Sequence, residues 1–126
     1  MKVLVFGASV KETRYSNIAM KMLKEYQHEI VAIGGRKGEV DGIEILTGHP
    51  ELEHVDTITL YIGPARQQEH YDYLIGLSPK RIIFNPGTEN LEFERMVTQA
   101  GIYAQRVCTL VLLRTGQFEI KENIAL

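Results

Sequence analysis

Cysteine, tryptophan and proline are scarce in this chain, and the scarcity of cysteine in particular narrows what the protein can be. Its 126 residues include one cysteine, no tryptophan and four prolines. The single cysteine, Cys108, cannot form an internal disulfide or a cysteine metal cluster, and its apolar flanks predict a buried, unreactive thiol. Such cysteine usage is typical of a reducing compartment, and we expect a cytoplasmic protein.

A strong charge of one sign and long apolar runs are also missing. The formal net charge is −2, which predicts no bulk attraction to nucleic acid. No apolar run is long enough to cross a bilayer, and strand-like sequence begins directly after Met1-Lys2, which leaves no room for a secretory leader. We therefore expect neither a nucleic-acid partner nor a membrane.

Motifs for catalysis or metal binding are absent as well. The four histidines, at positions 28, 49, 54 and 70, are scattered, and no zinc-protease motif, acid pair or hydrolase triad can be recognised. Lys121 and Glu122 are predicted to be solvated in a tail. We expect no metal and no catalytic residue.

What the chain does show is an alternation of strand and helix signals. An uninterrupted apolar run predicts a buried strand at residues 3–6, and a second buried strand is predicted at residues 81–84. Further strand signals lie at residues 29–33, 57–62 and 102–105. Helical spacing predicts helices at residues 16–26, 64–77, 91–100 and 109–114. Residues 43–46 are predicted to form an edge strand or an extended loop, and residues 50–53 a single helical turn.

This alternation predicts one domain over residues 1–126. We expect an α/β fold of three layers, a Rossmann-like doubly wound parallel sheet of about five strands. Ligands of such sheets bind at the carboxyl ends of the strands, so the loops that follow the predicted strands hold the candidate site.

The first of these loops contains Gly7-Ala8-Ser9 but lacks the later glycines of the dinucleotide-binding motif. Gly7 permits a tight turn, Ser9 offers a hydroxyl, and Ser16 can cap the next helix or bind an anion. Arg14 adds positive charge. A plain turn followed by a plain helix cap would explain the same residues equally well.

The loop after the second predicted strand reads Gly34-Gly35-Arg36-Lys37. NAD-binding domains usually carry an acidic residue here, whereas a cation suits an additional phosphate on the ribose, as in NADP or coenzyme A. A solvated basic turn is the alternative. Two further strands end in Tyr61-Ile62-Gly63-Pro64 and Asn85-Pro86-Gly87, which are either ordinary turns or walls of a pocket.

In their order along the chain, these motifs resemble the small coenzyme A-binding proteins, single Rossmann-like domains related to the α subunit of succinyl-CoA synthetase. The resemblance rests on Val3 to Ser9, Arg14-Tyr15-Ser16, the segments that end the third and fourth strands, and Cys108-Thr109-Leu110. It implies that Gly7, Ala8, Ser9 and Ser16 hold a pyrophosphate, that Arg36 lies near the ribose phosphate, and that Gly63 and Pro64 flank the adenine.

The resemblance favours a protein that binds coenzyme A or acyl-CoA, a small-molecule nucleotide cofactor, without catalysis of its own. An NADP-binding oxidoreductase-like domain and an interaction domain with a vestigial nucleotide site are the alternatives. The sequence does not set the oligomeric state, and a homodimer stays open.

Overall fold

A computed structural model describes residues 1–120, so Lys121 and Glu122 lie outside the described residues. The strands are β1 (Lys2–Ala8), β2 (Glu29–Gly34), β3 (Gly38–Val40), β4 (Ile43–Leu46), β5 (Thr57–Leu60), β6 (Arg81–Phe84) and β7 (Tyr103–Arg106). The helices are α1 (Tyr15–Glu25), α2 (Pro64–Gln67), α3 (Tyr71–Gly76), α4 (Leu91–Gln99) and α5 (Thr109–Arg114), with a 3₁₀ turn, η1, at Gln68–His70.

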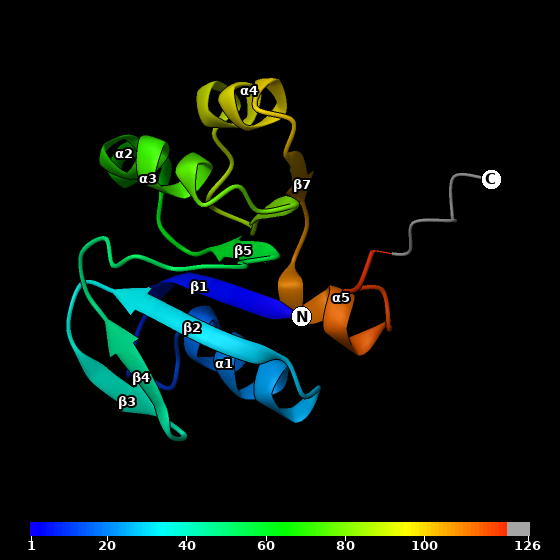
Figure 1. The fold of residues 1–126 in the computed structure, drawn as a ribbon. Coiled ribbons are helices and arrows are strands. Elements are labelled where there is room, and N and C mark those ends of the chain that lie inside the picture. Colours follow the sequence, from blue (N-terminus) through cyan, green and yellow to red (C-terminus); the bar gives the residue numbers. More distant parts are fainter. Residues whose placement is uncertain (121–126) are drawn as a thin grey trace.

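The strands form one twisted sheet in the order β3-β4-β2-β1-β5-β6-β7 (Figure 1). All neighbouring strands are parallel except β3 and β4, which are antiparallel. The strand order reverses between β1 and β5, as in a doubly wound sheet. The predicted Rossmann-like α/β fold is therefore confirmed, with seven strands in place of about five.

Strand β4 coincides with residues 43–46, predicted to form an edge strand or an extended loop, and it pairs with β3 in a hairpin at one edge of the sheet. Its two-residue turn is Asp41-Gly42, and both residues have positive φ, 49° and 83°. Asp-Gly is the preferred sequence for such a turn because the left-handed conformation costs these residues little. The Asp-Gly dipeptide is therefore a sequence signal for a hairpin turn. Because residues Gly38–Val40 contain no apolar run, the sequence pattern predicted no strand at that position.

Two apolar cores lie on the two faces of the sheet. Side chains alternate along β1, where Val3 and Val5 pack with α1 and α5, and Leu4 and Phe6 pack with α3 and α4. All four are at most 3% exposed, which explains why the strand reads as an uninterrupted apolar run. Figure 1 shows the same division, with α1 and α5 on one side of the sheet and α2, α3 and α4 on the other.

Three local predictions were wrong. The helix expected over residues 64–77 is divided into α2, η1 and α3, and the His70 backbone (φ −110°, ψ −3°), between η1 and α3, departs from ideal α-helical angles. Residues 50–53 form no helical turn, and the Pro50 carbonyl instead accepts a hydrogen bond from the Tyr73 hydroxyl. Cys108 is half-buried rather than buried, since it precedes the first residue of α5.

Among the described helices, none combines the length and the apolar character needed to cross a bilayer.

Candidate functional site

A cleft of about 850 Å³ opens at the carboxyl ends of the strands, on both sides of the point where the strand order reverses. Its walls come from the loops after β1, β2, β4, β5 and β6. The fold brings together most of the residues predicted from sequence at this cleft: Gly7, Ala8, Ser9, Arg14, Tyr15, Ser16, Gly34, Arg36, Tyr61, Gly63, Pro86 and Gly87. Ligands of doubly wound sheets bind at this position.

Two predicted residues do not line the cleft among the described residues. Pro64 is the first residue of α2 and lies next to Gly63, which does line it. The Asn85 side chain is 2% exposed and turned into the protein. Its amide nitrogen donates to the Thr59 hydroxyl and the Leu60 carbonyl, and its oxygen accepts from the Thr109 amide. Asn85 therefore joins β5, β6 and α5 rather than forming a wall of the cleft.

Gly7 lets β1 and the loop after β5 approach each other at the floor of the cleft. Its φ is +101°, and a Cβ atom placed there would lie 2.9 Å from both the Tyr61 carbonyl carbon and Ile62 Cγ2. Gly63 is different: its φ is −68°, and no atom of the described residues lies within 4 Å of a Cβ placed on it. The backbone requires a glycine at position 7 but not at position 63.

The N-terminus of α1 faces the cleft and has no side-chain cap. Arg14 occupies the cap position and makes no capping hydrogen bond, and the first turn contains no acidic residue. The Arg14 carbonyl accepts from the amides of Asn17 and Ile18, while the amides of Tyr15 and Ser16 find no acceptor among the described residues. Ser16, predicted as a cap, instead lies inside the first turn and is 3% exposed. Free amides and the positive end of the helix dipole attract an anion.

The side chains around the cleft are mainly cationic, although the whole chain carries a net charge of −2. The cationic residues that line it are Lys11, Arg14, Arg36, Lys37 and Arg66. Among the described residues Glu69 is the sole carboxylate in the lining. Such a concentration of positive charge in a concave site suits a ligand with several phosphates.

Gln67 holds two walls of the cleft at a fixed separation, and sequence reasoning missed this role. The side chain is fully buried, and its amide nitrogen donates to the carbonyls of Ile62 and Thr88 at 2.9 and 2.8 Å. Its oxygen accepts from Asn90 at 2.9 Å. A glutamine in a first helical turn gives no sequence signal for such bridging, because the two carbonyls become neighbours only in the folded sheet.

Tyr61 follows β5 and gives the cleft an apolar wall. Burial raises the pKa of Tyr61 to about 12, an effect that the nearby hydroxyls of Thr59 and Thr109 oppose only in part. These two hydroxyls bond to each other at 2.7 Å, and the Tyr61 hydroxyl has no partner among the described residues. Tyr61 is therefore neutral at physiological pH.

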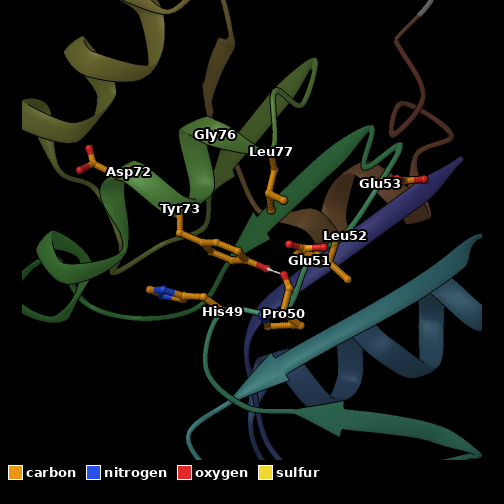
Figure 2. A pocket seen from close by; sticks show the side chains of 9 residues that line it. All are labelled: His49, Pro50, Glu51, Leu52, Glu53, Asp72, Tyr73, Gly76 and Leu77. Carbon is orange, nitrogen blue, oxygen red and sulfur yellow. Dashed lines mark hydrogen bonds between the residues drawn. The ribbon is translucent and has the colours of Figure 1, made fainter.

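Two of the histidines that look scattered in the sequence meet beside the cleft. His49 Nε2 and His70 Nδ1 are 2.7 Å apart, a hydrogen bond between residues 21 positions apart. Burial lowers the pKa of His70, although the Glu69 carboxylate opposes this, and the lowered pKa favours the neutral imidazole. His70 lines the cleft, whereas His49 lines a second pocket of about 460 Å³ that opens between the segment after β4 and α3 (Figure 2).

The sheet order, the cleft at its switch point and the uncapped helix facing the cleft define a Rossmann-like domain with an anion-attracting site. A family model described as "CoA binding domain" matches residues 1–114, and the chain therefore belongs to that family. The family expected from the sequence motifs is confirmed.

Solved structures share the fold of this chain. An uncharacterised protein of known crystal structure is 46% identical, with a TM-score of 0.90 over 93% of this chain and 97% of that one. A conserved hypothetical protein from Pyrococcus furiosus is 25% identical, with a TM-score of 0.77 over 87% of this chain and 97% of that one. A protein from Thermus thermophilus at 19% identity, covering 93% and 90% of the two chains, shares the fold with a TM-score of 0.81. No curated protein matches this chain significantly.

Proposed function

We propose that this protein binds coenzyme A or acyl-CoA in the cleft between β1 and β5, as a carrier or sensor that performs no reaction of its own. The observation that carries the proposal is the uncapped N-terminus of α1, which faces a cleft lined by cations. Coenzyme A carries a pyrophosphate and a 3′-phosphate, so it matches a site with one backbone anion position and separate cationic side chains.

The pyrophosphate is assigned to the segment from Gly7 to Ser16. The free amides of Tyr15 and Ser16 lie there, together with the hydroxyls of Ser9 and Ser16. A phosphate at this position would supply the cap that α1 lacks, which favours binding through both hydrogen bonds and the helix dipole. Ser9 Oγ already accepts from the Lys11 amide, so it can donate its proton to a phosphate oxygen.

Arg36 is assigned to the 3′-phosphate. It follows β2, is exposed and lines the cleft. A guanidinium can bind a phosphate through two parallel hydrogen bonds, which makes this end of the site selective for a phosphorylated ribose. Gly63 leaves room for the nucleoside close to the backbone after β5, because no atom lies within 4 Å of its missing Cβ.

The absence of a reaction is proposed from the surroundings of the lining hydroxyls. Ser9 and Ser16 are the serines of the cleft wall, and neither is hydrogen-bonded to a histidine or carboxylate within the described part of the chain. A serine nucleophile needs such a base to become reactive. Both hydroxyls are placed instead where they accompany the amides of the α1 N-terminus.

Calorimetric titration with coenzyme A, 3′-dephospho-coenzyme A, NADP and NAD tests the proposal. We expect coenzyme A to bind best, and to stabilise the fold by about 2.7 kcal/mol at a hundredfold excess over its Kd. Arg36→Ala should weaken coenzyme A about tenfold and leave the dephospho compound unchanged, because only the former carries the 3′-phosphate. Arg95→Ala, an exposed cation on α4 outside the cleft lining, is the matched control. Binding of NADP without coenzyme A would refute the proposal and favour the oxidoreductase-like alternative.

A further inference from the structure

Glu69 and His70 place a hydrogen-bond acceptor and an imidazole side by side on the wall of the cleft. His70 Nδ1 is engaged by His49, which leaves Nε2 as the free ring nitrogen. Glu69 Oε1 lies 3.6 Å from that Nε2, and both side chains line the cleft. The Glu69 side chain is 77% exposed, so its carboxylate is accessible to a ligand group that donates hydrogen bonds.

The position of this pair in the fold is the nucleoside end of the cleft. The His70 ring makes an edge contact with Phe6 of β1 at 4.8 Å between ring centroids. Its partner His49 lies three residues beyond β4, and β2 lies between β1 and β4 in the sheet. The pair therefore lies near the carboxyl end of β2, the strand that leads to Arg36. With the 3′-phosphate on Arg36, the base attached to the same ribose lies close to Glu69 and His70.

His49, the hydrogen-bond partner of His70, is held by an aromatic contact. Its ring stacks on Tyr73 with 4.3 Å between centroids and 10° between planes. The Tyr73 hydroxyl donates to the Pro50 carbonyl at 2.5 Å, so the ring of Tyr73 is held as well. Figure 2 shows the two rings side by side at the second pocket, with the Tyr73 hydroxyl directed at Pro50. When His49 Nε2–H donates to His70 Nδ1, the neutral His70 ring carries its proton on Nε2.

We propose that Glu69 and His70 recognise the adenine of the bound nucleotide and reject guanine. The Glu69 carboxylate accepts from the exocyclic amine, and the His70 Nε2–H donates to the adjacent ring nitrogen. Guanine presents a carbonyl oxygen where adenine presents the amine, so it would set an acceptor against the carboxylate. His49 acts through His70 as a positioning residue. This inference rests on the proposed function, because it places the base of the ligand proposed above.

Binding of adenosine 3′,5′-bisphosphate and guanosine 3′,5′-bisphosphate tests the inference, since these compounds differ only in the base. The wild type should bind the adenosine compound at least tenfold more tightly. Glu69→Ala should bring the two affinities within about threefold of each other. His70→Asn keeps an amide near the position of Nδ1 but removes Nε2, and it should weaken the adenosine compound about tenfold.

The positioning role of His49 is tested by comparing how two His49 variants discriminate between the adenosine and guanosine compounds. His49→Gln keeps a polar nitrogen near the position of Nε2 and should retain most of the discrimination, whereas His49→Leu should lose it. A merely structural role would make the two variants equal in discrimination. Glu51→Gln, a carboxylate of the second pocket outside the cleft lining, is the matched control and should behave as wild type.

Two results would overturn the inference, and they are distinguishable. If coenzyme A binds but the wild type holds both bisphosphates equally, base recognition by Glu69 and His70 is wrong and the proposed function stands. If neither coenzyme A nor the adenosine compound binds, the proposed function and the inference fail together. Thermal melts of each variant without ligand exclude misfolding as the reason for a lost affinity.

Discussion

Gly7 and Gly63 both line the cleft, but the backbone demands only the first. Gly7 has a left-handed backbone and lies against Tyr61 and Ile62, so any side chain there would both strain the chain and push β1 away from the loop after β5. Gly63 has ordinary extended geometry and an open space beside it. A residue that the fold does not require, in a cleft wall, is a candidate for contact with a ligand.

Substituting alanine at the two positions should therefore separate stability from binding. Gly7→Ala should lower the free energy of unfolding by about 2 kcal/mol or more, through strain at positive φ and close contacts with the neighbouring loop. Gly63→Ala should change stability by less than about 0.5 kcal/mol and weaken coenzyme A, because its methyl group enters the space assigned to the ligand. Urea unfolding and calorimetric titration measure the two effects. Equal affinities for coenzyme A in Gly63→Ala and the wild type would remove Gly63 from the site.

The sequence predicts where residues lie better than what they do. The strand-ending glycines and Arg36 come together at one cleft, because apolar runs determine which loops share an edge of the sheet. Asn85 follows a strand in the same way, yet its amide is used within the core. The contact between His49 and His70 depends on the path of two loops, and neither local spacing nor residue type carries that information.

At the scale of elements, the N-terminus of α1 lacks a side-chain cap. Its N-terminus offers free amides, carries no acidic residue and has an arginine at the cap position, where Ser, Thr, Asp or Asn would stabilise the helix. The apolar pattern predicted the helix to within one residue at each end, because burial of Ala19, Met20 and Leu23 determines it. The missing cap lowers the stability of the helix and leaves its first amides free to accept an anion.

The substitution Arg14→Asp should raise the stability of the unliganded protein and weaken its binding of coenzyme A. An aspartate at the cap position can accept from the free amides and adds negative charge near the positive end of the dipole, so the unliganded protein should gain about 0.5–1 kcal/mol. The same charge would repel the pyrophosphate, and coenzyme A should bind at least tenfold more weakly. Arg14→Ala, which removes the cation without adding a cap, should weaken binding with no gain in stability. A variant Arg14→Asp that binds coenzyme A as tightly as the wild type would show that the ligand does not occupy the α1 N-terminus.

At the scale of the whole molecule, folding concentrates positive charge at the cleft, which the net charge of the chain does not indicate. The net charge of −2 does not by itself indicate an anion site, yet the segments after β1, β2 and β5 bring Lys and Arg side chains to one cleft. The apolar pattern also misses β3, whereas β4 lies at residues 43–46, predicted as an edge strand or an extended loop. Thr47 and Gly48, which follow β4, complete a wall of the cleft. Long apolar elements can be predicted from sequence, while the short polar segments that shape the site depend on tertiary contacts.

The pH dependence of stability should show two separate steps. Burial lowers the pKa of His28, which packs on Phe118, and that of His70, so the folded protein disfavours their charged forms. Their contribution to stability is fully present above the ordinary histidine pKa of about 6.5 and is lost as pH falls below it, because the unfolded chain then binds more protons.

Glu94 is partly buried, which opposes its ionisation, but hydrogen bonds from Arg106 and the Asn90 amide hold its pKa below the ordinary value. Its contribution is lost only at more acidic pH, below about 4.5.

Thermal melts from pH 8 to pH 3 measure these steps. The wild type should lose stability first between about pH 7 and pH 5, and again below about pH 4.5. In the double variant His28→Asn/His70→Asn, the first step should shrink while the second remains, because the histidines and Glu94 titrate in different windows. Glu94→Gln should have the opposite pattern, with a lower Tm at neutral pH from the lost charged pair with Arg106 and a smaller acid step. A first step of full size in the double histidine variant would assign the loss of stability near neutral pH to other groups.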